Sequence, residues 1–347
     1  MKQIVNKSTG GYDVLDVQDV PDLSPGANEL LIRVKASGLN FADILARKGQ
    51  YPDGPATPCV MGYEVSGIVD KVGSGVTDDW LGKEVLAITR FGGQAEQVVV
   101  DASQVHEKPA RLSFEEAATL PVNYLTAWVL IVVMGGLRKG ESVLIHNAGG
   151  GMGLAQLDIA KHLGATTYGT ASPRKHEFLT RRGLDHAIDY RTADWHSELM
   201  KLTDDRGVEL ITDPLGGNHW KKSYKALRST GRLGMFGIST ASSRTESGSS
   251  GSFLTKLSLL KAVIGMPIYH PLPLLDKNRG VFGVNLGHLW HEGDKAAQWM
   301  KEILTGVDDG WINPHVDTTF SFNEIDDAHR YIEERKNIGK VILKPKE

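Results

Sequence analysis

The chain has 347 residues, enough for two domains, and its formal net charge of −3 and pI near 6.5 argue against a nucleic-acid-binding surface. A single cysteine, Cys59, excludes an internal disulfide and a cysteine-based metal cluster, which favours a reducing, cytoplasmic location. The apolar segment 253–275 is interrupted by lysines and prolines, and no N-terminal signal precedes it, so we expect no transmembrane segment.

Residues 1–124 are expected to form a mostly β domain. Strands are predicted, with glycine-rich turns between them, over 30–34, 63–72, 84–89 and 95–100. Ser113 followed by Glu115 and Glu116 resembles an N-cap with acidic residues in the first turn. This pattern predicts a helix over 113–118.

Residues 125–287 alternate between predicted strands and helices. The strands are expected at 143–145, 166–170, 187–189, 210–213, 231–237 and 281–285. Such alternation predicts a parallel, doubly wound α/β sheet of the Rossmann type. The polar loop 241–252 follows one of these strands, and its composition fits either a mobile lid or a passive loop.

Residues 288–347 leave this alternating pattern. Helices are predicted over 295–304 and 323–334, and strands over 318–322 and 340–343. We expect this segment to return to the first domain and complete it.

The most informative motif joins one predicted strand to the helix that follows it. After the apolar run Val143–Ile145, Ala148, Gly150 and Gly153 occupy the positions of a G-x-G-x-x-G fingerprint, with alanine in the first place. A side chain at Gly150 would block the approach of a pyrophosphate, and the helix N-terminus offers free N–H groups and a partial positive charge. The motif predicts a dinucleotide site; the alternative is a turn that only packs tightly.

The residues after the next strand indicate which dinucleotide binds. An NAD site usually has an Asp or Glu about 20 residues after the glycine turn, on the ribose 2′-hydroxyl. Here Ser172, Arg174 and Lys175 stand before the first acid, Glu177. Cations suit a 2′-phosphate, so the sequence favours NADPH, although Arg174 and Lys175 could instead be solvated charges at a helix start.

Several motifs together resemble the zinc-free quinone-oxidoreductase branch of the medium-chain dehydrogenase/reductase superfamily. They are 38–43 (GLNFAD), 47–52 (RKGQYP), 62–67 (GYEVSG), 120–127 (LPVNYLTA), 169–172 (GTAS), 188–190 (IDY), 213–217 (DPLGG) and 339–341 (GKV). Within that branch, the runs 175–177, 213–217, 285–287 and 336–340 are most similar to the vesicle amine transport protein homologues, with zeta-crystallin further off.

The resemblance implies a GroES-like catalytic domain and a Rossmann domain, with the active site between them. Zinc alcohol dehydrogenases of the superfamily hold their metal with cysteines and a histidine. The matching positions here are Asn40, Tyr63 and a residue near Val122, so we expect no catalytic zinc. His146, His162 and His176 are interpreted as structural or solvated.

Without a metal, reduction of a conjugated acceptor by hydride remains feasible. Tyr51 matches a tyrosine that resembles the proton donor of related enoyl reductases, or it lines the pocket without chemistry. Asn40 is expected to bind the acceptor carbonyl or the nicotinamide ribose, or to cap a local turn. Leu45 replaces a second tyrosine of many quinone oxidoreductases; Tyr63 is expected to fill the vacated zinc position and Phe91 to form a pocket wall.

The family pattern also implies the residues that bind the cofactor. They are Asn123, Thr126, Phe236, Asn285 and Gly287 near the nicotinamide, Ala148, Gly150, Gly151, Met152 and Gly153 at the pyrophosphate, and Ser172, Arg174, Lys175 and Tyr190 at the adenosine end. Asn337, from the C-terminal segment, is a further candidate.

The sequence therefore predicts an NADPH-dependent, zinc-independent reductase of quinones or α,β-unsaturated carbonyls. The alternative is an NADPH-binding protein that associates with a membrane or a partner and turns over little. A homodimer is expected through the edge strand 280–285, and a charge at Val281 or Val284 is expected to favour monomers.

Overall fold

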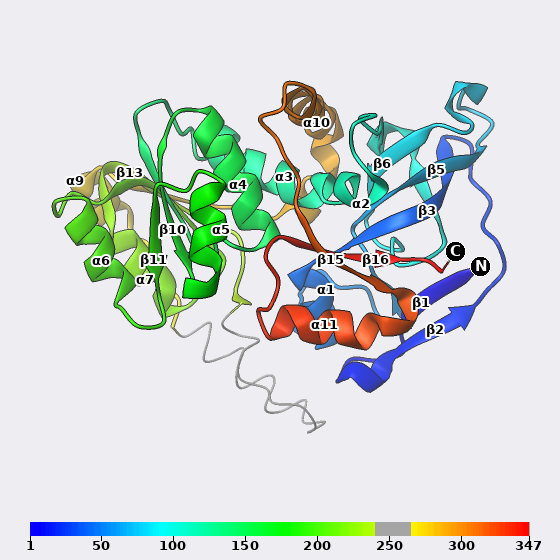
Figure 1. Ribbon diagram of the computed structural model, residues 1–347, viewed down its shortest axis with the longest axis horizontal. Helices are drawn as coiled ribbons and strands as arrows, with labels where there is room; N and C mark the ends of the chain where they lie inside the picture. Colours follow the sequence, from blue (N-terminus) through cyan, green and yellow to red (C-terminus); the bar gives the residue numbers. More distant parts are fainter. Residues whose placement is uncertain (240–264, 347) are drawn as a thin grey trace. The chain divides into compact units, whose positions relative to one another are not determined.

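The computed structural model describes residues 1–239 and 265–346, which form two compact units (Figure 1). The β unit comprises Met1–Leu125 and Leu286–Glu347, and the parallel-sheet unit comprises Thr126–Asn285. The predicted loop 241–252 and most of the apolar segment 253–275 lie outside the described residues.

The β unit is built on a seven-stranded sheet in the order β15-β16-β3-β5-β6-β8, with β7 also pairing with β3. Its strands are β3 (Glu29–Leu39), β5 (Glu64–Val72), β6 (Glu84–Ile88), β7 (Gln97–Asp101), β8 (Val105–Glu107), β15 (Val316–Ser321) and β16 (Lys340–Lys344). A smaller sheet joins β1 (Lys2–Asn6), β2 (Leu15–Asp19) and β4 (Cys59–Val60). Because β16 pairs with β3, the last strand of the chain lies inside the sheet that the N-terminal strands begin.

Alternating apolar residues of these strands form the core of the β unit. Leu30, Ile32 and Val34 of β3 pack with Val65 and Val69 of β5, and all five side chains are buried. The helices of this unit are α1 (Phe41–Arg47), α2 (Phe114–Ala117), α10 (Gly293–Asp308) and α11 (Ile325–Glu333). A second apolar cluster packs α11 against β1 and β16, which holds the two chain termini in one unit.

The parallel-sheet unit has six strands in the order β11-β10-β9-β12-β13-β14, all paired in parallel. They are β9 (Ser142–Ile145), β10 (Thr166–Ala171), β11 (His186–Asp189), β12 (Val208–Asp213), β13 (Leu227–Met235) and β14 (Gly280–Gly283). Counted from β9, the order is 3-2-1-4-5-6, the doubly wound order of Rossmann domains. The predicted fold class, a GroES-like β domain plus a Rossmann domain, is therefore confirmed.

Helices connect these parallel strands. They are α4 (Gly151–His162), α5 (His176–Arg181), α6 (Trp195–Leu202), α7 (Asn218–Lys225) and α9 (Pro271–Lys277). Within this unit α4 packs on β9 and β10, and α7 packs on β12 and β13. Buried Leu144, Tyr168, Ile188, Ile211 and Leu233 supply one side chain each from five neighbouring strands to a common core.

Most predicted elements exist, with bounds shifted by a few residues. Strand β13 ends at Met235 rather than 237, and β14 ends at Gly283 rather than 285. The predicted helix at 113–118 is α2, and Ser113 caps it: its hydroxyl accepts from the Glu116 N–H at 3.1 Å. Helix α1 was not predicted, because its seven residues cover less than two full turns and show little periodicity.

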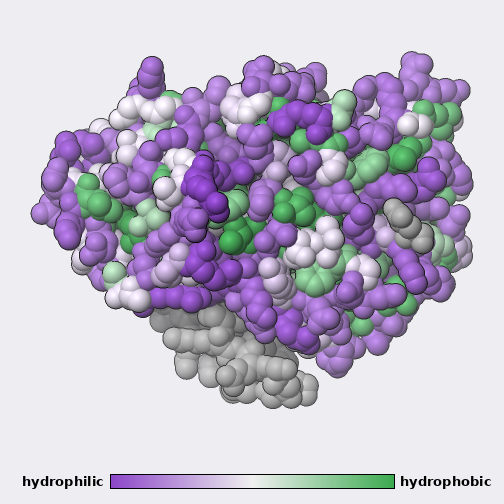
Figure 2. Space-filling view, in the orientation of Figure 1, coloured by the Kyte–Doolittle hydropathy of each residue, from purple (hydrophilic) through white to green (hydrophobic). Residues whose placement is uncertain are grey.

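One helical stretch, residues 114–133, is long and apolar enough to cross a membrane. It includes α2, α3 (Leu120–Trp128) and a π-helical turn, Val129–Val133. Since 78% of its apolar window is buried inside the structure, as in a core helix, it is weak evidence for a span and consistent with the expectation of no transmembrane segment. The face drawn in Figure 2 is mainly hydrophilic, with hydrophobic residues in small separate spots.

Candidate cofactor and catalytic sites

The carboxyl ends of the parallel strands carry many of the predicted cofactor residues. Because all six strands run the same way, these ends lie along one edge of the sheet. In sheet order, that edge carries Tyr190 after β11, Ser172 after β10, Ala148 after β9, Phe236 after β13 and Asn285 after β14. The glycine turn follows β9 and lies where the strand order reverses, the position at which doubly wound sheets bind ligands.

The turn after β9 approaches its neighbours so closely that only small residues fit. A Cβ atom at Gly153 would lie 2.3 Å from the Ala148 carbonyl oxygen, inside van der Waals contact. A Cβ atom at Gly169 of β10 would lie 2.8 Å from the Ala148 Cβ atom, which explains a small residue at the first fingerprint position. Gly150 is the N-cap of α4, so the free N–H groups of Gly151 and Met152 begin the helix beside the turn.

Lys175 folds against this turn. Its side chain is only 5% exposed, and a Cβ atom at Gly149 would lie 2.6 Å from its Cδ atom. Arg174, by contrast, is exposed, and Ser172 is buried and begins the 3-10 turn that carries both cations. Two segments that the sequence analysis linked only through the family pattern are therefore adjacent, and a lysine lies against the predicted pyrophosphate turn.

A buried polar network lies at the same edge of the sheet. His146 Nδ1 lies 3.0 Å from Thr170 Oγ1, and His146 Nε2 lies 3.2 Å from Ser223 Oγ. The Ser223 hydroxyl donates to Asp213 Oδ2 at 2.6 Å, and His219 Nδ1 lies 2.6 Å from the same oxygen. Burial lowers the pKa of His146 to about 3, so this imidazole is neutral at physiological pH.

His146, Asp213 and His219 are also the one group of three metal-ligand side chains among the residues that the structure describes. Each of their ligand atoms already takes part in a hydrogen bond of the network. Burial raises the pKa of Asp213, but hydrogen bonds from His219 and Ser223 outweigh it and hold the pKa below its usual value. The three side chains therefore have their hydrogen-bond partners within the fold, which agrees with the structural role expected for His146.

The β unit holds the predicted catalytic and pocket residues. Tyr51 and Tyr63 form an edge-on ring pair with centroids 6.2 Å apart, and Phe91 packs against Tyr63 at 5.7 Å. Leu45, on α1, is buried. Burial and the nearby carboxylates of Asp53 and Asp43 raise the pKa of Tyr51, so its phenol stays protonated at neutral pH.

Asn40 lies at the centre of a buried charge cluster that the sequence analysis missed. Its Nδ2 group donates to Glu64 Oε1 at 2.9 Å, and its Oδ1 atom accepts from Lys340 Nζ at 2.7 Å. Glu64 and Lys340 form an ion pair and are 0% and 3% exposed. The second oxygen of Glu64 accepts from the Val122 N–H at 2.7 Å, so the cluster joins β3, β5, β16 and the start of α3.

Asp43 lies next to this cluster on α1. It is fully buried and accepts from the backbone N–H groups of Asn40 at 2.7 Å and Gly62 at 3.1 Å. Burial raises its pKa to about 7, against the opposing effect of these hydrogen bonds. Asn40 is the N-cap residue of α1, so the local-cap alternative in the sequence analysis describes part of its environment.

The remaining predicted residues take varied places. Asn123 and Thr126 lie on α3 and are buried, whereas Gly287 lies in an exposed 3-10 turn after β14. Asn337 donates from Nδ2 to the Gly339 carbonyl at 2.8 Å, within the turn that leads into β16. The neighbouring His288 pairs with Asp53 at 2.9 Å, which joins this turn to the segment that carries Tyr51.

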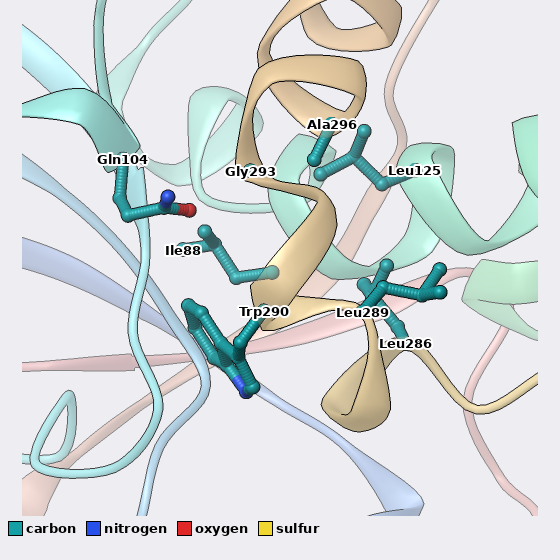
Figure 3. Close-up of a pocket in the computed structure, with 8 residues that line it drawn as sticks. All are labelled: Ile88, Gln104, Leu125, Leu286, Leu289, Trp290, Gly293 and Ala296. Carbon is teal, nitrogen blue, oxygen red and sulfur yellow. The ribbon is translucent and has the colours of Figure 1, made fainter.

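A small pocket in the β unit contains none of the predicted site residues. Figure 3 shows mainly apolar side chains around it, with one amide, from Gln104. Its apolar lining comes from β6, α3, α10 and the 3-10 turns after β14, through Ile88, Leu125, Leu286, Leu289, Trp290 and Ala296. Ile88 pairs with Glu64 in the sheet, so the pocket adjoins the strand that carries the charge cluster.

Proteins with this fold hold a dinucleotide and, in some cases, a catalytic zinc ion. The residues of this chain do not fit the two groups equally well. The glycine turn, with its small residues and free N–H groups, fits a dinucleotide. The positions expected to bind catalytic zinc hold Asn40 and Tyr63, and the chain has one cysteine, Cys59. A carboxamide and a phenol are not zinc ligands of the usual kind, so the residues at these positions do not fit a catalytic zinc.

Fold, glycine turn and sequence comparisons together define the class of protein: the chain belongs to the medium-chain dehydrogenase/reductase superfamily. Residues 26–110 match the family model of the alcohol dehydrogenase GroES-like domain, and residues 182–343 match that of the zinc-binding dehydrogenases. The second name describes a family and not the metal content of this chain.

Within the superfamily, the chain is similar to synaptic vesicle membrane protein VAT-1 homologues. It is 37% identical to the Rattus norvegicus protein over 99% of this chain and 84% of that protein. It is also 30% identical to quinone oxidoreductase-like protein 2 of Mus musculus, over 95% of this chain and 88% of that protein. These matches confirm the resemblance found in the sequence.

Solved structures of other proteins are similar to this chain over nearly its whole length. A mycobacterial protein in complex with NADPH superimposes with a TM-score of 0.85 at 29% identity, covering 99% of this chain and 100% of that chain. The CurK enoyl reductase superimposes with a TM-score of 0.84 at 29% identity, covering 99% of each chain. The neighbours of this chain thus include a quinone oxidoreductase-like protein and an enoyl reductase.

Proposed function

We propose that the chain is an NADPH-dependent, zinc-independent reductase of quinones or α,β-unsaturated carbonyls. The observation that carries the proposal is the glycine turn at the N-terminus of α4 with the side chain of Lys175 folded against it. Backbone N–H groups at such a turn bind a pyrophosphate, and a cation beside it suits a 2′-phosphate. The mycobacterial relative in complex with NADPH supports this choice of cofactor.

The order of residues along the sheet edge supports a cofactor bound in an extended form. Tyr190 and Ser172 follow the strands on one side of the glycine turn, and Phe236 and Asn285 follow strands on the other. An adenosine at the first side and a nicotinamide at the second would match the roles that the family pattern implies. The proposed cofactor residues are Asn123, Thr126, Ala148, Gly150, Gly151, Met152, Gly153, Ser172, Arg174, Lys175, Tyr190, Phe236, Asn285, Gly287 and Asn337.

The cofactor, when bound, supplies the hydride that an electron-poor acceptor carbon takes up. The chain then has to hold the acceptor, exclude water and deliver a proton. We assign proton delivery to Tyr51, whose raised pKa keeps the phenol protonated. Leu45 and Phe91 supply apolar surface that favours a flat conjugated acceptor.

Asn40 is proposed to organise the site rather than to bind the acceptor directly. Its amide nitrogen donates to Glu64 Oε1 at 2.9 Å and to the Gly38 carbonyl at 3.4 Å, so both of its N–H groups are used, and its oxygen accepts from Lys340. Held in this way, Asn40 fixes the junction between β3 and α1, the helix that carries Leu45.

A paired binding and turnover experiment tests the proposal. Purified protein is titrated with NADPH and NADH and then assayed with an ortho-quinone and a simple enone. We expect tighter binding of NADPH and acceptor-dependent oxidation, with kcat about 100-fold lower in Tyr51→Phe. Preference for NADH would overturn the assignment of Lys175, and tight binding without turnover of any acceptor would overturn the reductase.

The second candidate function is an NADPH-binding protein that associates with a membrane and turns over little. Two observations favour it: the VAT-1 relatives are named as vesicle membrane proteins, and Ile268, Leu272 and Leu275 are 96%, 66% and 72% exposed. Sedimentation with lipid vesicles separates the two candidates. Co-sedimentation that Leu272→Ser and Leu275→Ser abolish, in a protein without turnover, would favour this candidate over a cytoplasmic reductase.

A homodimer through β14 is proposed as well. Among the described residues β14 is an edge strand of the parallel sheet, and Gly280 and Gly283 are exposed. Such an edge presents unpaired backbone groups that a second copy can satisfy.

A further inference from the structure

The hydroxyl group of Tyr63 is buried and has no hydrogen-bond partner among the residues that the structure describes. Tyr63 directly precedes β5, between Gly62 and Glu64. An unpaired buried hydroxyl costs stability, and proteins rarely keep one without a reason. A side chain that only filled the vacated zinc position would not need this hydroxyl, because a phenylalanine would fill the same space.

Three polar side chains from the segments around Tyr63 already have partners. The Asn40 amide is bound by Glu64 and Lys340, and Asp43 accepts from two backbone N–H groups. The Thr89 hydroxyl donates to the Gly62 carbonyl at 2.7 Å. Each of these groups therefore serves the fold, whereas the Tyr63 hydroxyl contributes nothing to it.

The ring of Tyr63 is fixed from two sides. Tyr51 packs edge-on with an interplanar angle of 78°, and Phe91 packs at 58°. Such contacts hold the hydroxyl in one place without binding it. Burial, together with the Asp43 carboxylate, raises the pKa of Tyr63, so the group remains a proton-bearing donor at neutral pH and does not act as a base.

We propose that the Tyr63 hydroxyl binds the carbonyl oxygen of the conjugated acceptor. This inference rests on the proposed reductase function and adds to it the residue that recognises the acceptor. When hydride adds to the β-carbon, the electrons of the C=C bond move to the carbonyl, and negative charge develops on its oxygen. The Tyr63 O–H donates a hydrogen bond that strengthens as this charge grows and keeps its own proton. A proton, assigned above to Tyr51, then completes the saturated product.

This role selects for acceptors with a carbonyl oxygen. Asn40, the other polar group once expected to meet that oxygen, is occupied, so the recognition falls on one donor. A quinone and an enone both present such an oxygen in conjugation with the carbon that takes up hydride.

Tyr63→Phe tests the proposal because a contact with the substrate and a purely structural role predict opposite results. We expect kcat and kcat/KM for the enone to fall together by about 10- to 100-fold, since the lost hydrogen bond is strongest in the transition state. The dissociation constant of NADPH should not change. The melting temperature should stay the same or rise, because the substitution removes an unpaired buried hydroxyl.

Tyr331→Phe, in the same unit, is the matched control. The Tyr331 hydroxyl donates to Asp317 at 2.9 Å, so this variant should lose stability and keep full turnover. The opposite pattern in the two variants would separate a substrate contact from a structural one.

Three outcomes separate the proposed function from the proposed role of Tyr63. A wild-type protein that reduces no acceptor overturns the proposed function and the role of Tyr63 with it. An active wild type with unchanged kcat/KM in Tyr63→Phe overturns only the role of Tyr63. A drop in melting temperature in that variant shows a structural contribution and also overturns it.

Discussion

The glycine turn of the parallel-sheet unit and the charge cluster of the β unit illustrate two ways to build a site. The turn is local: Ala148, Gly150 and Gly153 lie within six residues, and backbone geometry decides what fits. The cluster is not: Asn40 and Lys340 are separated by 300 positions in the sequence. The first site can be recognised in a stretch of sequence, and the second exists only after the sheet has formed.

The two sites also differ in where their stability comes from. Small residues at the turn permit close packing, and the buried cation against them, Lys175, belongs to a separate segment after β10. The cluster instead buries the Glu64–Lys340 ion pair, whose charges have left water and depend on each other. We therefore expect substitutions in the cluster to affect folding and substitutions around the turn to affect binding.

The largest expected effect is on the cluster. Lys340→Met leaves the Glu64 carboxylate buried without its cation and should lower the free energy of unfolding by about 3–5 kcal/mol. The double variant Glu64→Gln, Lys340→Met removes both charges and should recover much of this loss. Urea denaturation of the three proteins measures both values.

Lys344→Met, on the same strand, is the control for this comparison. Lys344 is 38% exposed and pairs with Glu115 near the surface, so its loss should cost less than about 1 kcal/mol. Equal destabilisation by the two lysine substitutions would contradict the distinction between the buried pair and an ordinary surface pair.

A second prediction concerns the turn. Lys175→Ala should raise the dissociation constant of NADPH by about 10- to 150-fold, the worth of a charge-assisted contact of ~1.5–3 kcal/mol, and leave that of NADH nearly unchanged. Isothermal titration with both cofactors provides the measurement. Lys161→Ala, which removes a cation from α4 that pairs with Asp185, should change neither value. A parallel loss of NADH affinity would show that Lys175 acts on the pyrophosphate or on the fold of the turn and not on the 2′-phosphate.

A third prediction concerns the pH dependence of stability that buried His146 gives the parallel-sheet unit. The pKa of His146 is about 3 in the folded protein, below the 6.5 of an exposed histidine, so the unfolded chain binds the extra proton as pH falls. The stability is therefore complete above pH 6.5 and decreases toward pH 3, by about 2 kcal/mol at pH 5. His146→Asn should lack this component.

Urea denaturation at pH 7.5 and pH 5 tests this. The stability difference between wild type and His146→Asn should shrink by about 2 kcal/mol at the lower pH. A difference that is the same at both values would mean that His146 is already protonated, or solvated, in the folded state.

The smallest expected effect is on the edge of the parallel sheet. A charge at Val281 or Val284 is a poor test of the dimer, because Val281 packs on the core and Val284 is 8% exposed. Gly283 is exposed, and a side chain there meets only ordinary contacts. We expect Gly283→Lys to weaken dimerisation about tenfold, or ~1.4 kcal/mol, in sedimentation velocity. An unchanged distribution of species would exclude β14 as the interface.

The contrast between a local turn and a cluster of distant residues also determines how much of the structure could be predicted from the sequence. Strand β9, the turn and α4 could be predicted because periodicity and glycine spacing lie within one short segment. The proximity of Lys175 to that turn needed the parallel pairing of β9 with β10. Glu64 and Lys340 both stood in quoted motifs, Gly62–Gly67 and Gly339–Val341, yet nothing local in either motif shows that they pair.

Two further features of the structure, helix α1 and the unpaired hydroxyl of Tyr63, could not be predicted from the sequence. Helix α1 is too short to show periodicity, and its boundary at Asn40 depends on the Asp43 carboxylate, which accepts from the Asn40 N–H. The unpaired hydroxyl of Tyr63 has no sequence pattern at all, because it is defined by what its neighbours bind. Apolar periodicity predicts where a side chain is buried, but the partners of a buried polar group come from the whole fold.

The position of β16 has a consequence for how the protein is made. This strand, residues 340–344, lies between β15 and β3, and it carries the lysine that neutralises Glu64. During synthesis the first 125 residues leave the ribosome long before it does, whereas the parallel-sheet unit is complete once Asn285 has emerged. We expect the middle of the chain to fold first, and the β unit to close around Asn40 only when the final residues arrive.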